Sequence, residues 1–551
     1  MNEPTRHSTT QVPTSRPPTQ RYAISFSLAV VAQIVCACVV AWLSLAFRQG
    51  TEKDFAARPI LSVVTLWSLA FVFQMLSLRW GLKLKDTRRL AKGILLLGVS
   101  LRLIFLFTPP IQEIDLYRYL WDGAVVCEGI SPYRFSPAQL REVQTDDEDL
   151  RHLQKLLAEE PGLADVHSRV HYPQVTTVYP PISQCVFALT ALLVPKNATE
   201  MHHVVAMKFA IVLFDLGTMF VVMCLLRRLR MHSAWAIIYC WSPLVLKEFA
   251  NSGHLDSIAV FFTVLAFWFL KAGDSHPLRR IHAGSAASLA LGIGAKLYPI
   301  VLVPLCFAYV WKLSGARRAA AWATVLALTL VVAMAPMFAH RFAPAANAPE
   351  ESGLETFLSR WEMNDLLFMV VEENLRPDPP SETNRLAWFA IVPNQWRIAT
   401  TEFIASTTGL EESRIPFLAT RAITSILFLG FALWIAIRVS RDTSALLPAA
   451  FVTVAWFWLL SPTQNPWYWT WALPFVVFHR NRGWLLIAAV AMIYYCRFWF
   501  DYHPRQLTWL GYTYQNASIF DFAIVWLEFL PALVVIGIWQ WRMRSRERGG
   551  S

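Results

Sequence analysis

The chain has 551 residues, of which 55% are hydrophobic and only 16% are charged, and its formal net charge is +11. Soluble proteins carry roughly 25% charged residues. The composition therefore excludes a row of soluble domains, a disordered chain, a coiled coil and a disulfide-rich secreted scaffold. It predicts an all-α polytopic membrane protein.

The charges are distributed unevenly along the chain. Residues 110–180 contain twelve acidic and six basic side chains, and residues 339–416 contain the same numbers, so the rest of the chain carries +23. Short basic loops that alternate with long acidic ones are typical of the positive-inside rule. We therefore expect the two long acidic segments to be extracytoplasmic loops, and we do not expect a nucleic acid as partner.

The N-terminal third is simple to divide. Residues 1–22 form a polar tail rich in Thr, Ser and Pro, which predicts a disordered cytoplasmic segment. The apolar run at 23–47 is too long for a signal peptide and has no small-residue cleavage site, so we expect a retained first span. Further spans at 60–78 and 91–109 are each near the ~20 residues needed to cross a membrane.

The membrane spans within residues 181–311 are harder to assign from the sequence. The basic loop Arg227–Arg230 lies on the cytoplasmic side only if 181–195 dips into the membrane without crossing it. We also expect 283–311 to form a hairpin that is interrupted at Lys296–Pro299. This arrangement places Asn251–Asp256 and Lys296 near the outer face.

The transmembrane domain is expected to cover 23–541, with thirteen or fourteen spans, and the basic residues 542–551 form a cytoplasmic tail. The remaining spans are expected near 204–226, 233–250, 254–270, 319–338, 417–437, 445–461, 467–478, 484–500 and 519–540.

A polar and aromatic helix is predicted just after the third span. Asp115, Arg118, Tyr119 and Asp122 follow the helical spacing and share one face, while aromatic and apolar side chains share another. This pattern predicts a helix along the membrane surface. The alternative is a surface helix whose charges only pair with one another.

This stretch resembles the first outer loop of a known enzyme family. The sequence DLYRYLWDGAVVCEGISPYRF, followed by YPPISQ, is similar to GT-C-fold glycosyltransferases, and closest to bacterial mannosyltransferases that use polyprenyl-phosphate sugars. Similar motifs follow in the family's order, so that the resemblance spans residues 91–480. They are EFANSGHLDSIAVFF at 248–262, GAKLYPIVLVP at 294–304, FLSRWEMNDLLF at 357–368 and SPTQNPWYWTWALP at 461–474.

The resemblance implies a GT-C-like helical bundle with two large extracytoplasmic loops in a bacterial cytoplasmic membrane. It implies transfer of a hexose, with mannose as the leading expectation, from a polyprenyl-phosphate donor to a glycan or glycolipid acceptor of the cell envelope. Asp115 matches the family's general base, since a sugar hydroxyl is a poor nucleophile until its proton is accepted. Direct displacement at C1 implies inversion.

Further site residues follow from the matched motifs. Arg118 and Lys296 are expected to bind the donor phosphate. The alternatives are that Arg118 only holds Asp115 in place and that Lys296 has a structural carboxylate partner. His254 and Asp256 are expected to recognise substrate, with a helix cap as the alternative for Asp256. The remaining substrate-binding candidates are Tyr119, Asp122, Tyr133, Tyr179, Gln184, Asn364, Trp467 and Tyr468. The rings near Trp467 also fit an interfacial aromatic belt.

No cofactor is expected. Glu113 and Asp115 together would make a poor divalent metal site, so metal dependence is not favoured. Cys127 and Cys185 are the two cysteines in or near a long loop, and they are the one candidate pair for a disulfide on the outer face.

Two other functions compete with this interpretation. A transporter or lipid flippase would place charged side chains at mid-membrane depth, whereas here the polar clusters are expected at span ends and in the outer loops. A protein-modifying enzyme of the same fold would differ only in the shape of its acceptor loops.

Overall fold

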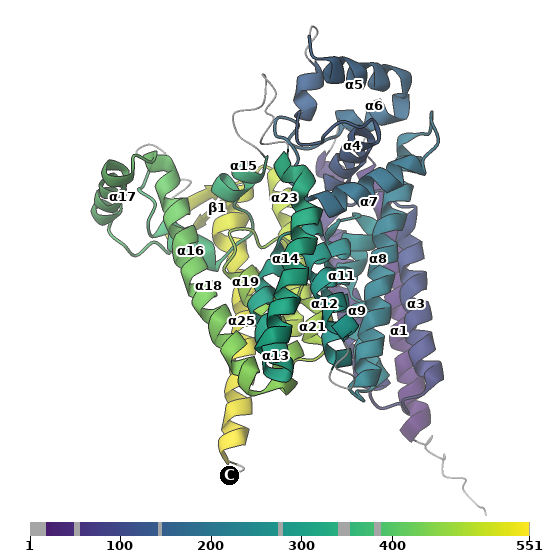
Figure 1. Cartoon of the computed structure of the whole chain (residues 1–551). Helices are drawn as coiled ribbons and strands as arrows, with labels where there is room; N and C mark the ends of the chain where they lie inside the picture. The colour runs from purple at the N-terminus through teal and green to yellow at the C-terminus, as the bar shows by residue number, and fades with distance from the viewer. Residues whose placement is uncertain are drawn as a thin grey trace, which may run out of the picture.

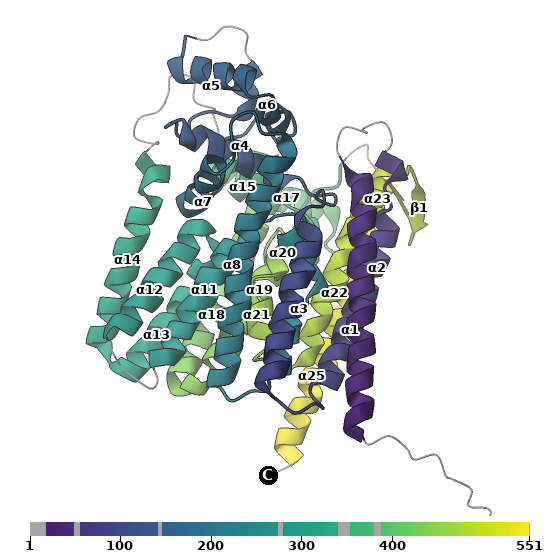
Figure 2. The same cartoon turned by 90° about the vertical axis from the view of Figure 1, so that its right-hand side faces the viewer.

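The computed structural model describes residues 18–48, 55–141, 146–273, 279–339, 353–379 and 387–549. In this part of the chain nearly all regular structure is helical. Its only sheet is an antiparallel hairpin of β1 (Gln506–Trp509) and β2 (Tyr512–Gln515), in which Gln506 pairs with Gln515. Long helices run side by side, and short helices gather at one end of the bundle (Figures 1 and 2). The predicted all-α fold is confirmed.

Seven helical stretches in the described residues are long and apolar enough to cross a membrane, and three shorter apolar helices accompany them. The polytopic architecture is therefore confirmed, while the expected total of thirteen or fourteen spans stays a prediction. The longer helices are α1 (Pro18–Leu43), α2 (Ile60–Gly81), α3 (Arg88–Leu106), α8 (Glu200–Arg228), α11 (Asp256–Gly273), α12 (Arg279–Ala295), α13 (Val303–Ser314), α14 (Ala316–Ala339), α18 (Ile415–Arg441), α19 (Leu446–Leu459) and α25 (Val525–Gly549).

Two of the expected spans, 233–250 and 467–478, are broken into short pieces. Pro243 and Pro466 each begin a new helical turn, because proline has no N–H to continue the preceding helix. The run 233–250 ends in a π-helical turn, Leu246–Asn251. The pieces are α9 (Ile237–Cys240), α10 (Pro243–Val245), α20 (Pro466–Trp469) and α21 (Leu473–Val476). Two further short helices, α22 (Ile487–Val490) and α23 (Cys496–Tyr502), lie within the continuous helical stretch Arg482–Tyr502, and α24 (Ala517–Ile519) begins the stretch Ala517–Arg546.

The first long loop forms a helical cap at one end of the bundle. It contains α4 (Asp115–Cys127), α5 (Glu148–Glu159) and α6 (Pro161–Ser168), and α7 (Pro181–Leu192) lies beside it. The second loop contributes α15 (Gly353–Arg360), α16 (Leu367–Glu373) and α17 (Asn394–Thr408). Figure 2 shows α15 and α17 at the same end as α4–α7, while α1 begins and α25 ends at the opposite end.

Two predictions about the chain termini are revised. Helix α1 begins at Pro18, so the last residues of the expected 1–22 tail are helical, and residues 1–17 lie outside the described part. Helix α25 continues to Gly549 through most of the expected 542–551 tail. Helix α7 has 12 residues and is one of the three shorter apolar helices, and the expectation that this segment does not cross the membrane stays a prediction.

Helix α4 does not expose its aromatic face, as a helix in the headgroup zone would, and its position along the membrane surface stays a prediction. Its residues from Leu116 to Gly123 are all buried, because α6, α7 and α8 cover them. At Gly123 a Cβ atom would lie 2.5 Å from the carbonyl oxygen of Phe187, so the glycine allows α4 to pack directly on the backbone of α7. The thiol of Cys127 donates to the carbonyl of Ala188, and both it and Cys185 are free rather than paired.

The bundle also contains an ion pair that the sequence analysis did not anticipate. Arg102 of α3 and Asp215 of α8 are fully buried, with Nε 2.6 Å from Oδ2. The guanidinium also donates to the carbonyl of Cys240, and the Tyr239 hydroxyl donates to Asp215. Charged groups are thus not confined to the ends of the spans. Both members of this pair are used in hydrogen bonds that join three segments of the fold.

Removing one member of this pair should destabilise the protein. Asp215→Ala leaves the Arg102 guanidinium buried without its counter-charge, which typically costs about 3–5 kcal/mol. We expect a clear drop in the Tm of the purified protein in detergent. The double variant Arg102→Met/Asp215→Leu should lose less, because it leaves no buried charge. An unchanged Tm for Asp215→Ala would show that the pair contributes nothing to stability.

Candidate active site

The turn that leads from α3 into α4 is held by side chains from other parts of the bundle. The buried Lys208 ammonium donates to the carbonyls of Phe105 and Thr108, at 2.6 and 2.7 Å, and so satisfies acceptors at the end of α3. The Asn251 amide donates to the carbonyl of Pro109 and accepts from the N–H of Ile111. These contacts fix the backbone just before Asp115.

Asp115 is the first residue of α4, where the positive end of the helix dipole favours a carboxylate. Its side chain is half-buried, and in the residues that the structure describes it makes no hydrogen bond or ion pair. Burial raises the pKa of the Asp115 carboxyl. Nearby His171 and Lys296 oppose this shift, and Asp256 adds to it. Asp115 is therefore an unengaged carboxyl with an increased proton affinity.

The ion pair that best fits a catalytic role is formed by Lys296 and Asp256. The Lys296 ammonium lies 2.6 Å from Asp256 Oδ1, and Trp471 Nε1 donates to the same oxygen at 2.6 Å. The other oxygen of Asp256 is buried without a hydrogen-bond partner in the described residues. Lys296 also lies over the Tyr468 ring, 4.4 Å from its centroid, and keeps 17% of its side chain exposed. The structure thus shows the carboxylate partner that was the alternative for Lys296.

His254 lies at the break between the π-helical turn and α11, after Gly253 with a φ of +71°. Its imidazole stacks on Trp467, with ring centroids 4.4 Å apart, and neither ring nitrogen has a hydrogen-bond partner in the part of the chain described. Nε2 lies 3.4 Å from a carboxylate oxygen of Glu248. Two unsatisfied nitrogens on a buried ring next to an acid are unusual in a purely structural histidine.

A second polar cluster lies next to His254. Lys247 and Glu248 are fully buried neighbours on the π-helical turn, and Glu248 accepts from the Tyr495 hydroxyl at 2.7 Å. Lys247 also bonds to that hydroxyl and lies over the Tyr495 ring. The sequence analysis missed this cluster, although two adjacent ionisable residues in an apolar run are a signal for a functional site.

Glu113 faces Lys247 from the turn before α4. Burial raises the pKa of Glu113 to about 8, with Lys247 lowering it and Asp115 raising it further. The described residues contain no group of three or more His, Cys, Asp or Glu side chains placed to hold a metal ion.

The Arg118 guanidinium is bound to partners other than the expected donor phosphate. Its Nε donates to Asp122 at 2.9 Å, and its Nη2 donates to the carbonyl of Val175. Gln184 donates to the other oxygen of Asp122 and to Thr177. The hydrogen bonds of Arg118, Asp122 and Gln184 therefore join α4 to α7 and to the segment before α7. In the described residues, Arg118 makes no hydrogen bond to Asp115.

The predicted tyrosines pack the same corner. Tyr119 stacks on Phe187, at 4.8 Å between ring centroids, and meets the edge of Tyr179 at 4.9 Å. The Tyr133 hydroxyl donates to the carbonyl of Tyr179. These rings pack the segment that follows His171 against α4, and their binding of substrate stays a prediction.

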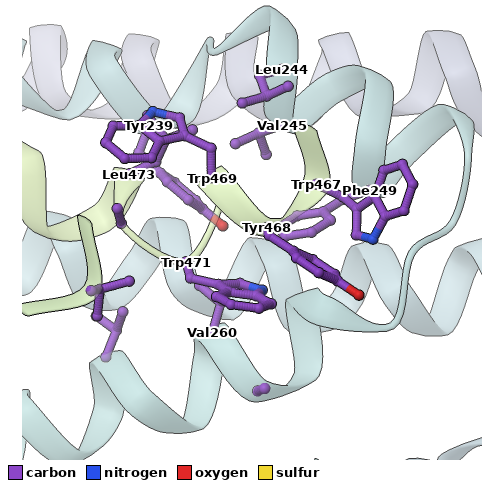
Figure 3. Packing of buried hydrophobic residues seen from close by; sticks show 14 of the residues in the cluster. Tyr239, Leu244, Val245, Phe249, Val260, Trp467, Tyr468, Trp469, Trp471 and Leu473 are labelled. Atoms are coloured by element: carbon purple, nitrogen blue, oxygen red, sulfur yellow. The ribbon is translucent and has the colours of Figure 1, made fainter. Parts of the chain in front are cut away.

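The aromatic rings of 467–471 are buried inside the bundle rather than exposed in a membrane belt. Figure 3 shows Trp467 beside Phe249 and Tyr468 over Trp471. The rings of Tyr468 and Trp471 are stacked at 4.4 Å, and Trp471 stacks on Tyr298 at 4.2 Å. The belt interpretation is wrong, because these rings line the region of Lys296 and His254.

Asn364 lies apart from Asp115, in the second loop. Its Nδ2 donates to the carbonyl of Gln464 and to Glu528, and a short parallel bridge pairs Met363 with Thr463. The FLSRWEMNDLLF and SPTQNPWYW motifs are thus adjacent in space.

Comparison with known proteins adds one finding. No curated protein and no solved structure matches the chain. The family model described as "Alpha-(1->6)-mannopyranosyltransferase, N-terminal domain" matches residues 103–313, which include α4, the cap, His254 and Lys296. The match supports a glycosyltransferase that transfers mannose. The part of the chain that carries Asp115 and Lys296 thus resembles a mannosyltransferase domain, as its motifs indicate.

Proposed function

We propose that the protein transfers a mannosyl residue from a polyprenyl-phosphate donor to a glycan or lipid-linked acceptor on the extracytoplasmic face of the membrane. The observation that carries this proposal is the unengaged Asp115 carboxyl near the Lys296–Asp256 pair. This arrangement combines a base with a cation, and the description of the matched family names mannose as the transferred sugar.

The sidedness follows from the charge distribution. The connection between α2 and α3 carries Lys83, Lys85 and Arg88, and the end of α25 carries four arginines in the last ten residues. These segments lie at the end of the bundle opposite to the α4–α7 cap (Figure 2). The positive-inside rule therefore favours an extracytoplasmic cap.

In the proposed reaction, Asp115 accepts the proton of an acceptor hydroxyl while the hydroxyl oxygen attacks C1 of the donor sugar. The bond between C1 and the phosphate oxygen breaks, and polyprenyl phosphate leaves with the electron pair. A single displacement inverts the configuration at C1. Lys296 stabilises the negative charge on the leaving phosphate, and the stacked rings of Tyr468 and Trp471 offer an apolar wall for the sugar.

The residues around Arg118 act indirectly in this scheme. Because Arg118 is paired with Asp122, we assign it a positioning role, in which it holds α4 and therefore Asp115 at a fixed place.

His254, beside Trp467 and Glu248, is proposed to contact the donor headgroup through its unsatisfied ring nitrogens.

Replacing the proposed base should abolish transfer. General base catalysis contributes about 10²–10⁴-fold, so Asp115→Asn should reduce the initial rate by that factor. The measurement uses purified protein in detergent with radiolabelled polyprenyl-phosphate mannose and membrane lipid extract. Asp146→Asn, an exposed carboxylate of the same loop, is the matched control. Equal rates for Asp115→Asn and the wild type would refute the role of Asp115.

The pH dependence should carry the signature of a raised carboxyl pKa. The base is active when deprotonated, so kcat/KM should rise with pH, with a midpoint above the ordinary Asp value of about 3.9. Lys296 lowers the pKa of Asp115, so Lys296→Gln should move this midpoint to higher pH. Lys312→Gln, exposed at the other end of the bundle, should leave it unchanged. A midpoint that is the same in Lys296→Gln would contradict this electrostatic coupling.

A further inference from the structure

Two arginines lie at the end of α18 that is nearer to the cap. Six residues separate the end of α17 from Ile415, the first residue of α18, and α17 lies at the cap end of the bundle (Figure 2). Arg414 directly precedes α18, and Arg421 follows seven residues later. Seven residues make almost two full turns of an α-helix, so the two side chains leave the helix in nearly the same direction.

Neither of these arginines has an acidic partner among the described residues. Arg421 Nη1 and Arg414 Nε are buried there without a hydrogen-bond partner. The other nitrogens of both guanidinium groups are also unbonded, but they keep contact with the surface, and both residues are only half-buried. Each guanidinium therefore has free N–H donors that a molecule outside the chain can reach.

Other arginines at the cap end differ from these two, because acids are plentiful there. Residues 110–180 and 339–416 each contain twice as many acidic as basic side chains. Five arginines of these two segments form ion pairs with acids, namely Arg118, Arg134, Arg169, Arg376 and Arg397. Arg414 has no such pair, although Glu411 and Glu412 lie close to it in the chain. The fold thus leaves Arg414 and Arg421 available for an external anion.

The Arg421 side chain extends toward the cap end of its helix. Helix α18 belongs to the stretch Glu412–Arg441, which is long and apolar enough to cross a membrane. Arg421 lies six residues after Ile415, about 9 Å along the axis at 1.5 Å per residue. Helical side chains lean toward the helix N-terminus, and the Arg421 guanidinium lies 5.9 Å from the ring centroid of Phe417, one turn nearer to the cap. The charge is therefore directed toward the headgroup zone, as expected for an arginine near the end of a span.

The surroundings of the two guanidinium groups fit a phosphate that is carried by a lipid. Arginine presents a planar fork of N–H donors that matches phosphate oxygens, and the positive end of the helix dipole adds to the attraction. Exposed apolar side chains follow along the same helix, among them Ile426 at 71% and Leu427 at 60% exposure. A lipid brings a phosphate and acyl chains together, so it fits this helix better than a water-soluble phosphate does. Two positive charges without a paired acid favour a headgroup with a net negative charge.

We propose that Arg414 and Arg421 bind the phosphate group of an anionic phospholipid in the membrane leaflet at the cap end. The phosphate accepts hydrogen bonds from both guanidinium groups, and the acyl chains run along the exposed apolar side chains of α18. This site is separate from the Lys296–Asp256 pair and does not depend on the proposed mannosyl transfer. Only the assignment of this leaflet as the outer one rests on the proposed function.

The test counts phosphatidylglycerol molecules bound to the purified full-length protein in detergent, by native mass spectrometry at increasing lipid concentration. We expect Arg414→Gln and Arg421→Gln each to weaken the tightest binding step about fivefold, the usual contribution of one basic side chain near a membrane surface. The double variant should lose both contributions, about twenty-fivefold. Arg421→Lys keeps the charge but not the planar fork, so it should lose less than Arg421→Gln. Phosphatidylglycerol binding by the double variant that equals the wild type would overturn the proposal.

Arg151→Gln is the matched control, because Arg151 is exposed on α5 and its replacement removes the same charge. This variant should bind phosphatidylglycerol as the wild type does, and gel filtration checks the folding of every variant. A second series uses polyprenyl phosphate in place of phosphatidylglycerol. If Arg421→Gln weakens the binding of polyprenyl phosphate alone, the occupant is the prenyl carrier and the phospholipid assignment is wrong. None of these measurements involves mannosyl transfer, so the proposed function stands or falls separately.

Discussion

An ionisable side chain inside a helical bundle is costly unless a partner compensates it, and this constraint organises the whole structure. Four buried or largely buried cations of the described residues meet an acid, a carbonyl or an aromatic ring, and in each case at least one contact joins segments that are far apart in the chain. The compensated groups are Arg102 with Asp215, Lys208 with the end of α3, Lys247 with Glu248 and Tyr495, and Lys296 with Asp256.

Asp115 differs from these compensated groups, because its carboxyl has no hydrogen bond or ion pair among the described residues. Its neighbours are fixed by Lys208 and Asn251 before α4 and by the Arg118–Asp122 pair within α4. A rigid frame around one carboxyl without a hydrogen bond is the arrangement that a base needs, because no internal donor competes with the substrate. The fold thus uses most of its polar groups as structure and leaves few for chemistry.

The sequence predicted the class of fold, and it selected residues that the structure places near one another. Hydropathy predicted a helical membrane protein, and the motifs selected Asp115, Asp256 and Lys296, which are neighbours in the structure. The catalytic and binding roles of these residues stay predictions. Contacts that depend on packing were not predictable. The burial of α4 follows from the close approach at Gly123, and the breaks at Pro243 and Pro466 turn apolar runs into short pieces. The sequence did not determine whether Arg118 pairs with Asp122, because a spacing of four residues in a helix allows this ion pair but does not require it.

In the proposed reaction, Lys296 is shared between Asp256 and the donor phosphate, and this sharing would link two equilibria. A phosphate that binds the ammonium brings negative charge to the acids around Asp115, so it would increase the proton affinity of Asp115. By thermodynamic reciprocity, a proton on Asp115 would in turn tighten donor binding. Under the proposed function, the Lys296–Asp256 pair therefore makes donor affinity depend on pH, and donor binding should weaken as Asp115 loses its proton.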